Sequence, residues 1–178
     1  MSDFFDVLGV PRRFALESAD LDRRFRELSQ QVHPDRFVGA PAPERRRALE
    51  QATTLNDAYR TLKDPVRRAA YFLRQCGLSI DAEGPEGRSQ VQLAPEFLGS
   101  FLELREVFEE DAKNPVARDE LRTHLMAERA RRVESLLRDL GAVPEGAERR
   151  VLLPLAQRLL ELRYYDRFLE ELEAEDDS

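Results

Sequence analysis

The chain has 178 residues, 42% hydrophobic and 35% charged, so it can bury a core beneath a densely charged surface. Its formal net charge of −7 argues against a nucleic-acid-binding protein, which needs a concentrated basic surface. A single cysteine excludes an internal disulfide and a cysteine-cluster metal site, and no apolar run approaches the length of a membrane-spanning helix. Because the acidic Asp3 and Asp6 argue against a secretory or transit signal, we expect a cytoplasmic protein.

Helical patterns fill the N-terminal part, and no stretch of the chain has a convincing strand pattern. A short helical turn at 4–9 ends at Gly9. A longer helix follows from residue 20, and Pro34 ends it because the residue before a proline is pushed out of the helical region. Its apolar stripe consists of Leu21, Phe25, Leu28 and Val32. Helices at 44–62 and 64–76 follow, and small alanines suit the first of them to close antiparallel packing.

The stretch at 77–94 is rich in glycine and proline and poor in apolar residues, so we expect a linker there. Three more helical patterns cover 95–112, 115–140 and 145–173. Their short connections imply antiparallel neighbours and therefore a three-helix bundle within 95–178. Pro154 lies inside the last pattern, and it either kinks that helix or marks its start.

The tripeptide His33-Pro34-Asp35 stands between two long helices and allows three interpretations. A catalytic role would make His33 a base oriented by Asp35, but no nucleophile with an oxyanion site lies nearby in the sequence. A structural role would place the imidazole at the C-terminal end of a helix, where a cation is favoured. The third interpretation is a loop that presents these side chains to a partner protein.

Three sequence blocks favour the partner interpretation. They are FFDVLGV at 4–10, HPDRF at 33–37 and NDAYRTLKDPVRRAAY at 56–71. In this order and spacing they resemble the J-domain family of co-chaperones. The resemblance implies an N-terminal J-domain at 1–76, built as a helical hairpin with a His-Pro-Asp loop. Such a domain binds an ATP-loaded DnaK-type chaperone and stimulates its ATP hydrolysis.

The resemblance also implies which residues touch the chaperone. The core contacts would be His33, Pro34 and Asp35, with Arg24, Arg26 and Arg36 as electrostatic partners. Rim charges of this kind steer association more than they tighten it. The chain departs from the family pattern because Glu27, Gln30 and Gln31 thin out the basic face of the helix, which hints at a dedicated chaperone.

The helix at 95–112 has more apolar residues than one core stripe requires. At 100° per residue, its phenylalanines and Leu104 form the core stripe, whereas Leu98 and Leu102 lie roughly 100–140° from Phe97, on the side of several glutamates. These leucines either widen the core face or form a binding patch, in which the leucines are buried by a partner and the carboxylates orient it.

A J-domain followed by a three-helix bundle resembles the HscB-type co-chaperones. This resemblance implies binding of an iron–sulfur cluster scaffold protein of the IscU type and its delivery to a specialised chaperone of the HscA type. The matching segments are FLGSFLELRE at 97–106 and LRYYDRF at 162–168. By position, the scaffold-binding residues would be Leu98, Leu102, Glu103, Glu106, Glu110 and Tyr164. Gly99 departs from the family, which often has a larger apolar residue at this place.

Two further features are assigned to the surface. The acids Glu120 and Glu128 flank His124 on one helix face, but a metal site in a bundle would need matching ligands from other helices. Arginine runs at 45–47 and 129–132 are interpreted as solvated faces with i,i+4 ion pairs. We therefore expect an adaptor that is not an enzyme and carries no metal, nucleotide or other cofactor. A J-domain adaptor for a different client protein, and an enzyme using His33 and Asp35, are the alternatives.

Overall fold

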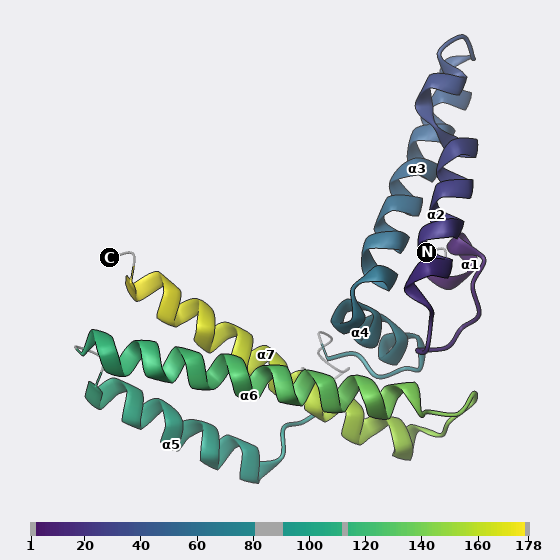
Figure 1. Cartoon of the computed structure of the whole chain (residues 1–178). Helices are drawn as coiled ribbons and strands as arrows, with labels where there is room; N and C mark the ends of the chain where they lie inside the picture. Colours follow the sequence, from purple (N-terminus) through teal and green to yellow (C-terminus); the bar gives the residue numbers. More distant parts are fainter. Residues whose placement is uncertain (1–2, 81–90, 112–113, 177–178) are drawn as a thin grey trace. The chain divides into compact units, whose positions relative to one another are not determined.

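The computed structural model describes residues 3–80, 91–111 and 114–176, and the regular secondary structure in these ranges is helical (Figure 1). The prediction of an all-α fold is confirmed. The chain divides into two compact units, Met1–Phe72 and Leu73–Ser178, and the boundary falls inside helix α4 (Pro65–Gln75). Within the expected linker, residues 81–90 lie outside the described residues. No helix in the described ranges is both long and apolar enough to cross a membrane.

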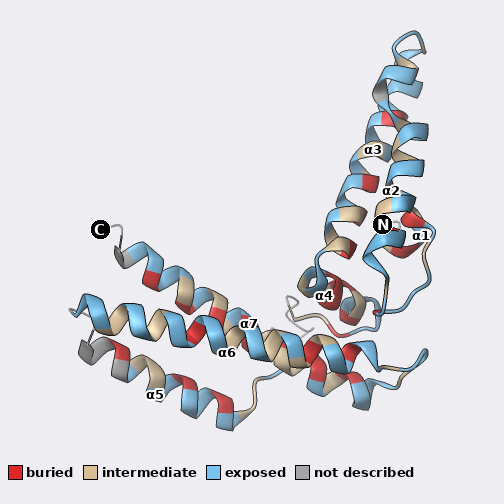
Figure 2. Ribbon diagram, viewed as in Figure 1, coloured by how far each residue is buried: buried red, intermediate tan, exposed pale blue. Residues whose placement is uncertain are grey.

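The first unit is a helical hairpin braced by a short N-terminal helix. Besides the first part of α4, its elements are α1 (Phe4–Leu8), α2 (Ser18–Val32), the 3₁₀ helix η1 (Pro34–Phe37) and α3 (Ala42–Lys63). Most buried residues of the hairpin lie on α3, and exposed residues cover the outer sides of both helices (Figure 2). α2 contributes the buried Leu21 and the half-buried Phe25, Leu28 and Val32. The core of this unit combines residues of α1, α2, α3 and α4. They are Phe5, Leu8, Leu21, Leu55, Ala58, Leu62 and Tyr71.

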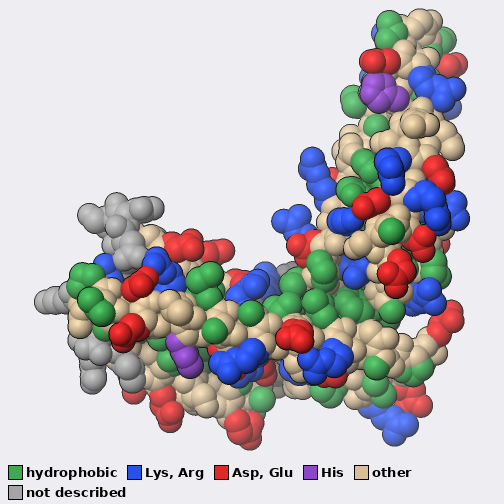
Figure 3. Space-filling view, viewed as in Figure 1, with side chains coloured by type: hydrophobic (Ala, Val, Ile, Leu, Met, Phe, Trp, Pro, Cys, Tyr) green, Lys and Arg blue, Asp and Glu red, His purple; other side chains and the backbone are tan. Residues whose placement is uncertain are grey.

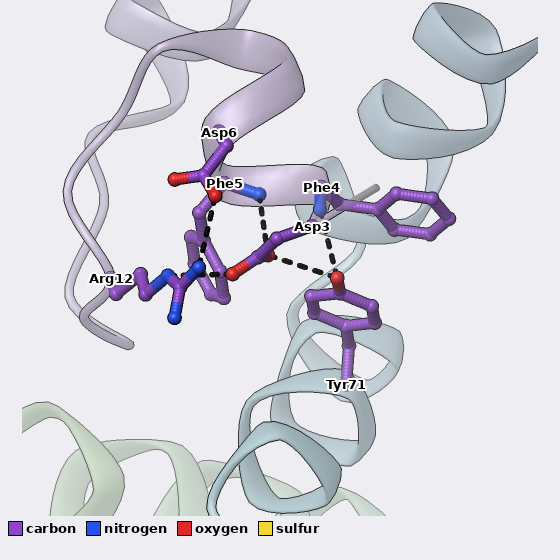
Figure 4. A network of polar contacts seen from close by, with 6 residues as sticks. All are labelled: Asp3, Phe4, Phe5, Asp6, Arg12 and Tyr71. Carbon is purple, nitrogen blue, oxygen red and sulfur yellow. Dashed lines mark hydrogen bonds and ion pairs between the residues drawn. The ribbon is translucent and has the colours of Figure 1, made fainter. Parts of the chain in front are cut away.

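A polar network fixes α1 to α4 (Figure 4). The Asp3 carboxylate caps α1 by accepting a hydrogen bond from the Phe5 backbone N–H at 3.0 Å, and it pairs with Arg12 Nε at 2.6 Å. It also accepts a hydrogen bond from the Tyr71 hydroxyl at 2.9 Å. The same hydroxyl accepts one from the Phe4 backbone N–H at 2.8 Å. Because Tyr71 belongs to α4, this network closes the first unit between its two ends.

A second network joins α2 to the end of α3 on one flank of the hairpin. The Asp22 carboxylate accepts hydrogen bonds from the Tyr59 hydroxyl, at 2.8 Å, and from Lys63 Nζ. These bonds, the one from Lys63 first, hold the pKa of Asp22 below its ordinary value. Tyr59 also stacks on the Phe25 ring, with 4.1 Å between the ring centroids. The hairpin is therefore fixed by apolar packing and by charge on the same flank.

The second unit contains three long helices that run side by side (Figure 1). They are α5 (Pro95–Asp111), α6 (Pro115–Gly141) and α7 (Arg149–Asp176). Their aromatic core consists of Phe97, Phe101 and Phe108 from α5 with Tyr165, Phe168 and Leu172 from α7, closed by Leu125 from α6. Since α7 begins at Arg149, Pro154 lies inside the helix and does not mark its start.

Candidate functional site

The His-Pro-Asp loop (His33, Pro34 and Asp35) connects α2 to η1. His33 ends α2 with extended backbone angles (φ −60°, ψ 127°), as the following proline requires. Its Nδ1 accepts a hydrogen bond from the Asp35 backbone N–H at 3.3 Å, so the imidazole caps the start of η1. The structural role considered for His33 was to bind the carbonyl groups at the end of α2. The imidazole instead bonds to a backbone N–H of the next helix, η1. Pro34 begins η1, and its side chain lies outside the described part.

The side chains of His33 and Asp35 are open to solvent, with 58% and 86% of their surface exposed. Their Nδ1 and Oδ2 atoms are 3.6 Å apart, which exceeds hydrogen-bond reach. The carboxylate therefore does not orient the imidazole as a nucleophilic mechanism requires. The exposed side chains are suited to contact with another molecule.

The three arginines expected to assist this loop do not form one face. Arg24 and Arg26 are exposed on α2, but residues two positions apart point about 200° apart around a helix. Arg24 lies 3.7 Å from the carboxylate of Glu27. Arg36 donates a hydrogen bond to the backbone carbonyl of Gln30 at 3.2 Å, which brings it to the end of α2 beside the loop. Among the three, only Arg36 is held at the loop by a bond that the structure shows.

The two arginine runs differ in their partners. In the run at 129–132, Arg132 pairs with Glu128 at 2.9 Å, which is the expected i,i+4 contact, and Arg129 pairs with Asp166 of α7. One expected i,i+4 pair is therefore formed, but Arg129 and Arg132 are half-buried and pair with α7, so this run is not the solvated face that was expected. Glu128, considered above as a metal ligand, is used in these ion pairs.

The run at 45–47 lies near the start of α3 and is exposed. Arg45 donates to the backbone carbonyl of Ala40 at 3.0 Å, and within the described ranges Arg46 and Arg47 form no ion pair. Arg47 lines a groove of about 520 Å³ together with Gln31 and Val32, the last residues of α2. Lys and Arg side chains are visible over much of the hairpin, interspersed with acidic ones (Figure 3). The expected i,i+4 pairs are not formed here, so basic charge beside the loop remains open to solvent.

A second candidate surface lies on α5, and we call it the leucine patch: Leu98, Leu102, Glu103 and Glu106. Leu98 is 40% exposed and Leu102 is 59% exposed, whereas Phe97 and Phe101, which each precede one of them, are buried in the core. The leucines therefore lie outside the core face. Glu103 and Glu106 are exposed as well. Glu110 lies on α5, and its side chain is outside the described part.

Tyr164 reaches α5 from α7. Its half-buried ring packs edge-on against Phe97 and Phe101, with centroid distances of 6.1 Å and 5.8 Å. Since these phenylalanines are the chain neighbours of Leu98 and Leu102, the ring supports the part of α5 that carries the leucine patch. Tyr164 thus contacts the two core phenylalanines that neighbour the leucine patch, and its predicted role in scaffold binding stays a prediction.

Two arginines that were not among the predicted site residues fix α5 to the bundle. Arg132 of α6 lies over the rings of Phe97 and Tyr165, 5.8 Å and 5.2 Å from their centroids, and pairs with Glu161 of α7 at 3.0 Å. Burial raises the pKa of Glu161, and the nearby arginines Arg132 and Arg158 oppose this rise.

Further along α5, Arg105 pairs with Glu171 at 2.7 Å and lies 5.2 Å from the centroid of the Phe168 ring. The two arginines attach α5 to the other helices at two places about two turns apart. The leucine patch is therefore presented on a helix whose orientation is fixed before any partner binds, which lowers the entropic cost of binding.

Known proteins resemble the N-terminal unit and the greater part of the chain. The DnaJ domain family model matches residues 3–71. The co-chaperone protein HscB homolog of Burkholderia multivorans is 41% identical over 148 residues, which cover 81% of this chain and 82% of that protein. The homolog of Bordetella pertussis is 37% identical over 134 residues, which cover 75% and 76% of the two chains.

Solved structures extend the similarity over the whole chain. Chaperone HscB from Vibrio cholerae is 29% identical and superposes with a TM-score of 0.70, covering 99% of this chain and 98% of that one. Human co-chaperone protein HscB, at 22% identity, shares the fold with a TM-score of 0.74, covering 99% of this chain and 83% of that one. The chain therefore belongs to the HscB family of co-chaperones and carries a DnaJ domain at its N-terminal end.

Proposed function

We propose that the chain binds an iron–sulfur cluster scaffold protein of the IscU type through the leucine patch and delivers it to a dedicated DnaK-type chaperone of the HscA type. As a member of the HscB family, the chain is a co-chaperone, not an enzyme, and serves iron–sulfur cluster assembly with a chaperone of the 70-kDa class. Its relatives in Burkholderia and Bordetella are bacterial proteins, and we propose the cytoplasm as its location.

The observation that carries the proposal is the exposure of Leu98 and Leu102 on a helix that is already fully packed on its other side. An isolated exposed leucine is common on protein surfaces, but two of them one turn apart form a continuous apolar strip. The strip is bordered by carboxylates, which suits an interface with an apolar centre and a polar rim. Membership of a family that serves iron–sulfur cluster assembly supports a cluster scaffold protein as this partner.

The proposed division of labour follows the predicted modules: a J-domain at 1–76, a linker at 77–94 and a scaffold-binding bundle at 95–178. The chaperone contact uses His33, Pro34, Asp35, Arg24, Arg26 and Arg36. The scaffold contact uses Leu98, Leu102, Glu103, Glu106, Glu110 and Tyr164. Simultaneous binding at both places couples scaffold capture to ATP hydrolysis on the chaperone, and such couplings are typically about 1–3 kcal/mol.

The test combines a binding assay and an ATPase assay. Immobilised full-length chain should retain purified IscU-type scaffold, and the chain should raise the steady-state ATPase rate of the HscA-type chaperone. His33→Gln should abolish this stimulation and leave scaffold retention unchanged, because His33 is exposed and far in sequence from α5. Its melting temperature should fall only slightly, because the hydrogen bond lost from the Asp35 N–H is exposed. A loss of scaffold retention in this variant would contradict the assignment of the two functions to separate surfaces.

A further inference from the structure

The two flanks of the helical hairpin are closed to different degrees. Around α2, Phe25 lies about 60° to one side of Leu28 and Gln31 about 60° to the other side. On the Phe25 flank, the stack with Tyr59 and the hydrogen bonds to Asp22 bridge α2 and α3. On the Gln31 flank, the space between these helices stays open as a groove of about 520 Å³, which we call the hairpin groove.

The floor of the hairpin groove is apolar. It is formed by Leu28 and Val32 of α2, Leu55 of α3 and Val7 of α1. Leu55 is buried, but the other three are only half-buried at the edge of the core of the first unit. Part of their apolar surface therefore stays in contact with solvent. An apolar side chain of a partner that covered this floor would remove the exposed surface from water, which is favourable.

One wall of the hairpin groove carries a positive charge. Around α3, Arg47 lies about 80° from Leu55, on the side of the groove. Glu50 also lines the groove but points further outward, at about 140° from Leu55. Arg47 is exposed and forms no ion pair among the residues that the structure describes. The hairpin groove therefore suits an apolar side chain that has a carboxylate beside it.

The hairpin groove is continuous with the His-Pro-Asp loop. Gln31 and Val32 are the last two residues of α2, and His33 follows them directly. Arg36 is held at the same end of α2 by its hydrogen bond to the Gln30 carbonyl. A partner that binds the exposed side chains of the loop therefore lies next to the groove.

We propose that the hairpin groove is a second contact for the DnaK-type chaperone. It receives a surface segment of the chaperone, in which an apolar side chain packs on Leu28 and Val32 and a neighbouring carboxylate pairs with Arg47. The carboxylate adds a charge-assisted hydrogen bond to the apolar contact, and two joined contacts bind more tightly than the loop alone. This inference rests on the proposed binding of the chaperone by the His-Pro-Asp loop and adds a surface that raises the affinity.

The test is a titration of the chaperone ATPase with increasing concentrations of the full chain. Arg47→Glu should raise the concentration that gives half-maximal stimulation about tenfold, because repulsion replaces attraction at the interface. The maximal stimulated rate should not change, because the His-Pro-Asp loop stays intact. Arg60→Glu is the matched control, since Arg60 is exposed on the same helix about 140° from Leu55 on the far side. This control should leave the titration unchanged.

A second variant tests the space itself. Gln51 is exposed on the wall of the hairpin groove, so the ring of Gln51→Trp fills the groove without entering the core. This variant should also raise the half-maximal concentration, and its melting temperature should match that of the natural chain.

The possible failures are distinguishable. If both groove variants titrate like the natural chain while His33→Gln abolishes stimulation, the second contact is refuted and the loop contact stands. An equal shift for Arg60→Glu would also refute it, because net charge alone would then explain the result. If the groove variants instead lose scaffold retention at an unchanged ATPase titration, the groove binds the scaffold and the proposal is wrong. If the natural chain does not stimulate the ATPase, both proposals fail.

Discussion

Replacing Leu98 and Leu102 together by alanine removes the apolar surface on which scaffold binding is proposed to depend. A leucine that a partner buries completely contributes about 1.5–3 kcal/mol. Scaled by the exposed fractions of 59% and 40%, Leu102 can contribute about 0.9–1.8 kcal/mol and Leu98 about 0.6–1.2 kcal/mol. Together they amount to about 1.5–3 kcal/mol, so the dissociation constant should rise between about 10- and 150-fold.

The assay is isothermal titration of the full chain with purified IscU-type scaffold, combined with calorimetric melting of the chain alone. Met126→Ala is the control, because Met126 is 57% exposed on α6 and lies outside the leucine patch. This control should leave affinity unchanged, and the leucine double variant should melt within a few degrees of the natural chain. A large loss of stability, or unchanged affinity in the double variant, would refute the reasoning.

Three further substitutions test the polar contacts. Tyr71→Phe removes the hydroxyl that bonds to the Phe4 N–H, and it should lower the free energy of unfolding by about 1–2 kcal/mol in thermal denaturation. Asp22→Asn should destabilise the first unit at neutral pH. This difference should disappear in acid, because the stability from a lowered pKa is complete above the ordinary value of 3.8 and is lost as the pH falls through the lowered one. Arg132→Met leaves Glu161 without this partner and should cost about 1–2 kcal/mol of stability as well as weaken scaffold binding.

Each of these three predictions has a contrary result. Unchanged melting of Tyr71→Phe would show that the network between α1 and α4 adds nothing to stability. A difference for Asp22→Asn that persists unchanged in strong acid would show that the ionised carboxylate is not responsible. If Arg132→Met melts lower but binds the scaffold with unchanged affinity, the arginine does not position the leucine patch.

Helical spacing separated Leu98 and Leu102 from the core stripe, because the helical wheel depends only on sequence separation. Spacing left open whether the two leucines widen the core face, and their exposure in the structure decided this. The turn at the His-Pro-Asp loop was equally predictable, since proline constrains the residue before it whatever the tertiary contacts are. Helical periodicity and the constraint that proline places on its neighbour thus predicted the helix of the leucine patch and the turn at the His-Pro-Asp loop.

Contacts between helices were not predictable in the same way. Nothing in the spacing of Arg132 shows that it will meet Glu161, which is 29 positions away on another helix. The i,i+4 relation to Glu128 was the one available signal for this arginine. Similarly, the runs at 45–47 and 129–132 look alike in sequence, but in the described ranges only arginines of the second run pair with carboxylates of a neighbouring helix, Asp166 and Glu161.

In the proposed function, a single chain holds the scaffold and engages the chaperone at the same time. The most direct measurement is the chaperone ATPase rate in the presence of scaffold, with either the natural chain or an equimolar mixture of His33→Gln and the Leu98→Ala, Leu102→Ala double variant. Each variant in the mixture retains one function. If delivery needs both functions on the same molecule, the natural chain should stimulate hydrolysis far more than the mixture at equal concentrations. Equal stimulation by the mixture would contradict the claim.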